Sequence, residues 1–285
     1  MTLRVDLHVH TNRSIDGRHS LERMAAAAKR AGLDAIAITD HDQCTLPPPE
    51  LEGVLLIPAC EISTQVGHIT GLFLDRPVAF DTLCKDGRPT GQAAVEEIHR
   101  CGGLAVAAHP FQKPGVDGSR LPPGLDAMEG VNARANFKVS DANARARQWA
   151  MDHHLPAVGG SDSHGFQEVG NGYTEVDCPK KNLSALKEAI AAGRCRPVLR
   201  RHTTHREKGL SQLAKARKRG GVLRTGKALA YVVFCLYGDL LHGPKKEETH
   251  VSSDPIHRSG QKGQAPVPGP AAGPHTGLFV AGPPH

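Results

Sequence analysis

Short apolar runs that end in histidine, aspartate or glutamate recur through the first two thirds of this chain, and they constrain its fold more than any other feature. The first run, residues 3–9, carries His8 and His10 at its end. Because side chains in a strand alternate between its two faces, both imidazoles project to the same side. Two neutral imidazoles that converge on one point make half of a metal site. The later runs are followed by further side chains of this kind: Asp16, Asp40, His41, Asp42, Glu61, His68, His109, Asp162 and His164.

The apolar runs alternate with helical patterns, and this alternation predicts an α/β fold with parallel strands. We predict seven strands, at residues 3–9, 34–39, 54–59, 68–74, 104–108, 127–131 and 156–159. We predict helices at residues 21–31, 93–101, 141–153 and 183–192. Seven strands of this kind favour a barrel over an open sheet. In such barrels the chemistry lies on loops at the carboxyl ends of the strands, which is where the candidate ligands fall.

The composition changes after the last helical pattern. Residues 1–195 carry 20 Lys and Arg against 24 Asp and Glu, whereas residues 196–285 carry 15 against 5. The basic residues concentrate in 196–227, and an apolar stretch over 228–241 follows. The remaining residues are rich in Pro, Gly and Ser without periodicity, which is typical of disorder. We therefore predict a barrel over 1–197, a basic and apolar helical extension over 198–242 and a disordered tail over 243–285.

The cysteines and the start of the chain predict a cytoplasmic protein. The seven cysteines form no Cys-x-x-Cys pair and are odd in number, so a disulfide framework is not expected. No signal-peptide pattern fits, because Arg4 and Asp6 interrupt the first apolar run. A membrane-peripheral location is the alternative, since the basic segment and the apolar stretch together suit an anionic membrane surface. The stretch of 14 residues over 228–241 is shorter than the roughly 20 needed to span a membrane.

The candidate ligands are informative only as a set. A single histidine after a strand is more often hydrogen-bonded structure than a ligand, and Asp16 before a glycine would by itself predict a turn. Together the imidazoles and carboxylates suit divalent ions such as Mn, Fe or Zn. Without Asp40 and Asp42, which flank His41, nine such side chains remain. They exceed the needs of one ion, so we predict two to three ions that share a carboxylate. Glu61 is the candidate bridge, because its carboxylate offers two oxygens.

These motifs together resemble the PHP (polymerase and histidinol phosphatase) superfamily over residues 3 to about 197. The resemblance is carried by His8-Val9-His10, Thr39-Asp40-His41-Asp42, Ala59-Cys60-Glu61, Gly67-His68, Ala108-His109-Pro110 and Gly160-Ser161-Asp162-Ser163-His164. It implies a distorted seven-stranded (βα)7 TIM-like barrel that binds up to three metals and hydrolyses phosphoesters. It also implies a first metal on His8, His10, Glu61 and Asp162, a second on Glu61, His68 and His109, and a third on Asp16, His41 and His164.

The chemistry expected of such a site is attack by a metal-bridging hydroxide, which is formed near neutral pH. Asp40 is a candidate for orienting a ligand imidazole from behind. Arg134 follows a strand end and Arg13 lies in the loop after His10, so each guanidinium is a candidate for binding a substrate phosphate, with a surface charge as the alternative. The stand-alone phosphoesterases that the chain resembles imply a nucleotide-type phosphomonoester, such as a nucleoside 3′,5′-bisphosphate, or a short 5′-phosphorylated RNA.

Two other classes of protein compete with this prediction. The first is a binding protein with structural metals, whose basic segment contacts nucleic acid or a membrane surface. The absence of aromatic residues between Arg196 and Lys227 weakens the single-stranded nucleic-acid version, because bases stack on aromatic side chains. The second is a metal-dependent amidohydrolase on a related barrel, which is disfavoured because no lysine stands at a strand end to bridge metals.

Overall fold

The structure, a computed structural model, describes residues 1–44, 46–113 and 118–242. The tail predicted over 243–285 lies outside these residues. The strands are β1 (Thr2–Val9), β2 (Ala35–Ile38), β3 (Glu50–Leu51), β4 (Val54–Thr64), β5 (Gly67–Leu72), β6 (Leu104–Ala108), β7 (Ala127–Asn132), β8 (Ala157–Gly160), β9 (Gly172–Asp177) and β10 (Cys195–Leu199). The α-helices are α1 (Leu21–Arg30), α2 (Phe80–Leu83), α3 (Gly91–Arg100), α4 (Ala142–Asp152), α5 (Leu183–Ala191), α6 (His205–Arg219) and α7 (Val222–His242), with short 3₁₀ turns at Gly118–Arg120 and Ala135–Phe137.

The strands form one sheet in the order β10-β9-β1-β2-β4-β5-β6-β7-β8, with β3 paired to β4. The sets β1-β2-β4 and β6-β7-β8 are parallel. The prediction of seven parallel strands was wrong for β5, which runs antiparallel to both neighbours, and it missed β3, β9 and β10. Only two residues join β4 to β5, too few for a parallel crossover. The missed strand β9 has the mixed sequence Gly-Tyr-Thr-Glu-Val-Asp, so no apolar run marks it.

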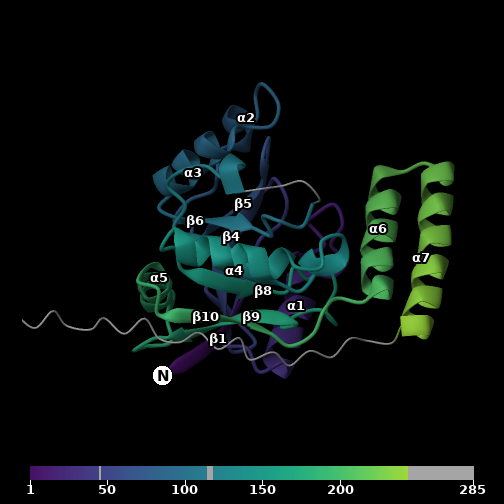
Figure 1. Ribbon diagram of the computed structural model, residues 1–285. Coiled ribbons are helices and arrows are strands. Elements are labelled where there is room, and N and C mark those ends of the chain that lie inside the picture. Colours follow the sequence, from purple (N-terminus) through teal and green to yellow (C-terminus); the bar gives the residue numbers. More distant parts are fainter. Residues whose placement is uncertain (45, 114–117, 243–285) are drawn as a thin grey trace, which may run out of the picture. The chain divides into compact units, whose positions relative to one another are not determined.

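The two ends of the sheet approach each other, which gives the nearly closed barrel that the strand pattern predicts (Figure 1). Ser163, just after β8, pairs with Val9 of β1. The buried carboxylate of Asp6 accepts hydrogen bonds from the backbone N–H of Ser161 and of Gly170, each at 2.9 Å. Burial raises the pKa of Asp6 to about 6, although these hydrogen bonds lower it. Asp6 therefore ties β1 to the segment that follows β8.

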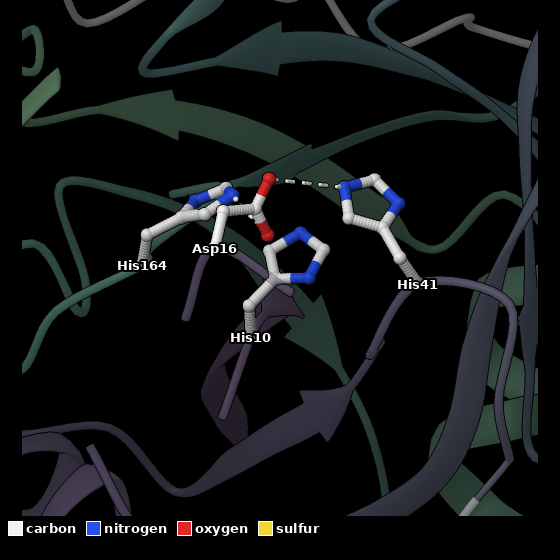
Figure 2. Close-up of side chains that lie close together, drawn as sticks. All are labelled: His10, Asp16, His41 and His164. Carbon is white, nitrogen blue, oxygen red and sulfur yellow. Dashed lines mark ion pairs between the residues drawn. The ribbon is translucent and has the colours of Figure 1, made fainter. Parts of the chain in front are cut away.

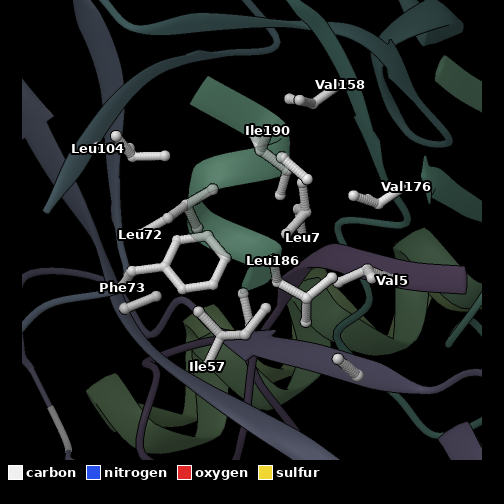
Figure 3. Close-up of a cluster of buried hydrophobic side chains, with 14 of the residues drawn as sticks. Val5, Leu7, Ile57, Leu72, Phe73, Leu104, Val158, Val176, Leu186 and Ile190 are labelled. Atoms are coloured by element: carbon white, nitrogen blue, oxygen red, sulfur yellow. The ribbon is translucent and has the colours of Figure 1, made fainter. Parts of the chain in front are cut away.

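Buried side chains of several strands and of α5 form one of the apolar clusters of the core (Figure 3). Alternate residues of β1, Leu3, Val5 and Leu7, face this core, and Leu186 and Ile190 of α5 pack into it. The pairing of β1 with β2 shifts register between residues 6 and 9. A bulge of this kind re-aims side chains. The shift lies where β1 changes from core residues to His8, and His10 follows directly after the strand.

The predicted helical extension is a hairpin of two neighbouring helices, α6 and α7 (Figure 1). Thr204 and Glu207 form a capping box at the start of α6, so the first backbone N–H groups are satisfied. Gly220 and Gly221 join the helices with φ angles of 71° and 95°, which glycine adopts without strain. Among the described helices, none combines the length and apolarity that crossing a membrane requires. The domain limits at residues 197 and 242 stay predictions.

Candidate metal centre

The structure gathers all nine predicted ligands into one cluster. Most lie near the carboxyl ends of strands or in the loops that follow them, whereas His68 lies at the amino end of the antiparallel strand β5. They form four overlapping groups, and within each group the potential ligand atoms lie within 4.8 Å of one another. The groups are His10, Asp16, His41 and His164; His8, His10 and Asp162; His8, Glu61 and His109; and His41, Glu61 and His68. These groups share members, as do the sets that the resemblance implies, and the division of the ligands among three metals stays a prediction.

Glu61 of β4 is fully buried and lies at the centre of the cluster. Its Oε1 lies 2.9 Å from His68 Nδ1 and 3.0 Å from His109 Nε2, and its Oε2 lies 3.1 Å from His41 Nδ1 and 3.4 Å from Nε2 of both His8 and His10. Burial alone would raise the pKa of Glu61, but the surrounding imidazoles hold this pKa well below its ordinary value. Both carboxylate oxygens therefore face potential ligands, as a bridging carboxylate requires.

Asp16 connects the other end of the cluster, where imidazoles from three different segments surround it (Figure 2). Its Oδ1 lies 3.3 Å from His164 Nε2, and its Oδ2 lies 3.8 Å from His41 Nε2. Lys215 of α6 places its Nζ 3.4 Å from the same Oδ2. The helical hairpin thus reaches the cluster directly, a contact that no pattern in the sequence predicts.

The donor set fits divalent cations. Two ligands bound at about 2.1 Å in a tetrahedral site lie about 3.4 Å apart. His8 Nε2 and His10 Nε2 are 3.1 Å apart, and each lies 3.4 Å from Glu61 Oε2. Among the described buried atoms, His41 Nδ1, His68 Nδ1 and Glu61 Oε2 have no partner in hydrogen-bonding geometry, although the two nitrogens lie 3.1 and 2.9 Å from oxygens of Glu61. Since such atoms are costly unless something satisfies them, they indicate a place for cations.

Glu129 of β7 is a functional candidate that the sequence reasoning missed. Its Oε1 accepts a hydrogen bond from His8 Nδ1 at 3.1 Å. Its Oε2 accepts from the backbone N–H of His109 at 2.7 Å and from Asn132 Nδ2 at 3.0 Å. A proton held on Nδ1 leaves the Nε2 lone pair of His8 directed at the cluster. An acidic residue inside the buried run 127–131 was the signal that could have identified it.

Two candidate ligands have a backbone conformation that is uncommon outside glycine. The φ angle is 30° at His109 and 52° at Asp162. Histidine and aspartate are among the residues that tolerate this left-handed region best, at a cost in free energy. His109 follows β6 directly, and Asp162 lies two residues beyond the end of β8. The reversed backbone turns both side chains back toward the cluster.

Gly160→Ala is expected to disturb this centre from behind. A Cβ at Gly160 would lie 2.4 Å from the Cβ of His8 and 2.8 Å from Glu129 Oε1. The added methyl group must displace His8 and Glu129 from their positions. We therefore expect weaker metal binding and a loss of about 1–3 kcal/mol in the free energy of unfolding. Gly226→Ala is the matched control, because a Cβ there meets nothing within 4 Å. Chemical denaturation and metal titration of both variants test this, and equal behaviour would refute it.

The remaining predicted site residues have different surroundings. Asp40 accepts hydrogen bonds from the N–H and Oγ1 of Thr11, at 2.7 and 2.6 Å, and from Ser14 N–H at 3.2 Å. These contacts order the loop that leads to Asp16. None of them involves an imidazole, so the predicted role of Asp40 in orienting a ligand imidazole stays a prediction. Arg13 is exposed, and its carbonyl oxygen accepts a hydrogen bond from a side-chain amide at 2.6 Å.

Arg134 lies inside the site, with only 8% of its surface exposed. Its Nη2 donates to Ser211 Oγ of α6 at 2.9 Å, and its Nε lies 3.7 Å from Glu168 Oε2. Its Nη1 contacts His164 Nδ1. The predicted phosphate-binding arginine is therefore positioned by α6 and a buried carboxylate, directly beside a candidate metal ligand.

Comparisons of the sequence with known proteins find two matching family models and a relative. A family model described as "PHP domain" matches residues 6–101, and one described as "PHP-associated" matches residues 140–195. An uncharacterized protein of Methanocaldococcus jannaschii is 32% identical over 127 residues, which cover 38% of this chain and 68% of that protein.

Solved structures share the fold. A two-domain protein of Bacteroides vulgatus that contains a predicted PHP-like metal-dependent phosphoesterase aligns with a TM-score of 0.53 and 21% identity, over 70% of this chain and 65% of that one. An endonuclease Q complex, solved with a 27-mer duplex that has an abasic lesion at the active site, aligns with a TM-score of 0.50 and 17% identity, over 67% of this chain and 57% of that one. The chain thus spans less than two thirds of each of these two proteins.

Proposed function

The chain belongs to the PHP domain family, and on that premise we propose that it is a metal-dependent phosphoesterase. The observation that carries the proposal is the convergence of nine imidazole and carboxylate side chains on a cluster centred on Glu61, with buried ligand atoms left unpartnered. One structural relative is described as containing a predicted PHP-like metal-dependent phosphoesterase, and another as an endonuclease in complex with a duplex substrate, which supports phosphoester chemistry for this fold.

We assign two to three divalent ions, Mn, Fe or Zn, to the four overlapping groups. When bound there, such cations supply an acidified water and neutralise the charge that develops on phosphoryl oxygens. The chain's own contribution is to hold the ligands in one protonation state and one orientation. Glu129 fixes the tautomer of His8, and Asp40 orders the loop that presents Asp16. His41 and His68 keep 16% and 25% of their side chains exposed, so one side of the cluster is open to a substrate.

Arg134 and Arg13 are the proposed substrate-binding cations. A guanidinium binds phosphate oxygens in pairs, and the burial of Arg134 strengthens such a contact. The proposed substrate is a nucleotide-type phosphomonoester, such as a nucleoside 3′,5′-bisphosphate, or a short 5′-phosphorylated RNA. Cations held by the acidic groups of the cluster would attract a negatively charged phosphoester more strongly than an uncharged substrate.

Phosphate release from a panel of phosphoesters tests this proposal. The panel holds a nucleoside 3′,5′-bisphosphate, AMP and a 5′-phosphorylated oligonucleotide, each with added Mn²⁺. We expect turnover that EDTA abolishes and that Asp162→Ala reduces by at least about a hundredfold, because a candidate ligand is lost. Asp152→Ala at the exposed end of α4 is the control. Turnover that survives EDTA or Asp162→Ala would refute the proposed mechanism.

A binding protein with structural metals is the second candidate, and α7 is the observation that favours it. Its exposed large apolar side chains include Val222, Leu223, Val233, Phe234 and Leu240. Exposed basic residues of α6 and α7 flank the turn that joins the helices, which is the charge pattern that suits nucleic acid or an anionic membrane surface. Structural metal sites are closed, whereas this cluster has partly exposed ligands. A metal-loaded protein that turns over nothing on the panel would favour the binding function.

A further inference from the structure

Helix α6 is fastened to the loop 12–17, which carries Asp16. Lys218 Nζ donates hydrogen bonds to three backbone carbonyl oxygens of this loop, at 2.6 to 2.9 Å. Three acceptors match the three N–H donors of an ammonium group. The two family models match residues 6–101 and 140–195 and therefore do not include α6. How α6 acts on the metal centre is thus a question about this chain and not about the matched segments.

Lys215, three residues before Lys218 and on the same face of α6, directs its ammonium group at the metal centre. Its Nζ lies 3.4 Å from Asp16 Oδ2, and only 29% of its side chain is exposed. One of the four candidate ligand groups, called here the Asp16 group, consists of His10, Asp16, His41 and His164 (Figure 2). Lys215 therefore places a positive charge beside a carboxylate oxygen that this group would offer to a cation.

The other two candidate ligand carboxylates, Glu61 and Asp162, have different neighbours. Both oxygens of Glu61 face imidazoles. The carboxylate of Asp162 lies 3.4 to 4.0 Å from imidazole nitrogens and 3.4 Å from the amide nitrogen of Asn132. Arg134 Nη1 reaches the backbone carbonyl oxygen of Asp162, at 3.4 Å. Among the described residues, no Lys or Arg forms an ion pair with either carboxylate, whereas Asp16 pairs with Lys215.

Asp16 also has hydrogen-bond donors for both of its oxygens without a metal ion. Its Oδ1 accepts from Ser14 Oγ at 3.1 Å, and its Oδ2 accepts from Lys215 Nζ at 3.4 Å. Oε2 of Glu61, in contrast, is buried with no partner in hydrogen-bonding geometry. A buried carboxylate that already has an ammonium partner gains less from a further cation than one without such a partner. The Asp16 group therefore differs from the groups that contain Glu61 both in charge and in hydrogen bonding.

We propose that Lys215 acts as a built-in cation at Asp16 and makes the Asp16 group bind its metal ion more weakly than the groups that contain Glu61. This inference rests on the proposed function, because it concerns the occupancy of the same metal centre. Two positive charges at one carboxylate repel each other, and the partial burial of Lys215 limits screening by solvent. Lys218 holds α6 against the loop, which keeps the ammonium group of Lys215 at Asp16. The centre then holds two ions tightly and exchanges a third readily.

Titration of the EDTA-treated and desalted full-length chain with Mn²⁺ tests this inference without any catalysis. By calorimetry we expect Lys215→Met to bind the last ion about tenfold or more tightly than the unaltered protein, because a repelling charge is removed. Methionine keeps a long apolar side chain at this position. Lys215→Arg keeps the charge and should keep the weak step. Lys227→Met, at an exposed lysine of α7, is the matched control and should bind like the unaltered protein. Elemental analysis after dialysis against a limiting Mn²⁺ concentration counts the bound ions.

The direction of the change separates this inference from a structural role of Lys215, since damage to the site would weaken metal binding. Unchanged or weaker binding by Lys215→Met would overturn the inference, and so would equal gains in Lys215→Met and Lys215→Arg. The gain should disappear when Asp16→Asn is combined with Lys215→Met, and a gain that persists would also overturn it. If the unaltered protein binds no Mn²⁺, the inference and the metal centre fail together. If the predicted gain is seen but no phosphoester of the panel is hydrolysed, the inference holds and the proposed function fails.

Discussion

Glu61→Gln is expected to abolish the phosphoesterase activity and to reduce the number of bound metal ions. Both oxygens of Glu61 lie within 3.4 Å of histidine nitrogens, five imidazoles in all. Glutamine keeps the shape of the side chain but has one oxygen and no charge, so it cannot bridge two cations. We expect kcat/KM to fall by at least about a hundredfold, the upper end for groups that only orient a ligand. Phosphate release and elemental analysis of the purified protein measure the two effects.

Glu96→Gln is the matched control for this change, since Glu96 is an exposed residue of α3 with no contact to the cluster. It should keep both activity and metal content. Unchanged metal content in Glu61→Gln would contradict the bridging role of Glu61. Lost activity with full metal content would instead indicate that Glu61 acts on the bound substrate and is not needed for metal binding.

Glu129→Gln is expected to weaken metal binding by about 10- to 100-fold, although Glu129 belongs to none of the four candidate ligand groups. Its carboxylate accepts hydrogen bonds from His8, from the backbone of His109 and from Asn132. A glutamine amide would direct an N–H at one or two of these donors. His8 would then lose its fixed tautomer, and a buried donor left without an acceptor costs about 1–3 kcal/mol. Metal titration and denaturant unfolding of the metal-free protein measure the two effects separately.

The control for Glu129 is Glu188→Gln on the exposed surface of α5, which should match the unaltered protein in both measurements. A Glu129→Gln variant that binds metal normally would show that the imidazole of His8 needs no carboxylate behind it. A variant that loses stability but not metal affinity would assign Glu129 to the fold alone. We predict that Glu129→Gln loses both stability and metal affinity. The carboxylate of Glu129 contacts the side chain of one candidate ligand, His8, and the backbone of another, His109.

The sequence by itself was enough to identify the fold class and the nine side chains that the structure gathers. Both follow from local rules. Buried strands appear as short apolar runs, and polar side chains that follow such runs fall at one edge of a barrel. Two of the strands that the sequence did not reveal, β9 and β10, contain charged residues such as Glu175 and Arg196. Their place in the sheet comes from pairing with β1 and with each other, which no local pattern encodes.

Only the tertiary structure decided which groups stand behind the candidate ligands. Glu129 and His8 are 121 residues apart in the chain, and Lys215 and Asp16 are 199 residues apart. Neither pair has a sequence spacing that indicates contact, because the approach depends on how the sheet closes and on where the hairpin packs. Arg134 illustrates the difference. Its position after a strand predicted that it lies near the site, but its contacts with His164, Glu168 and Ser211 exist only because three distant segments meet there.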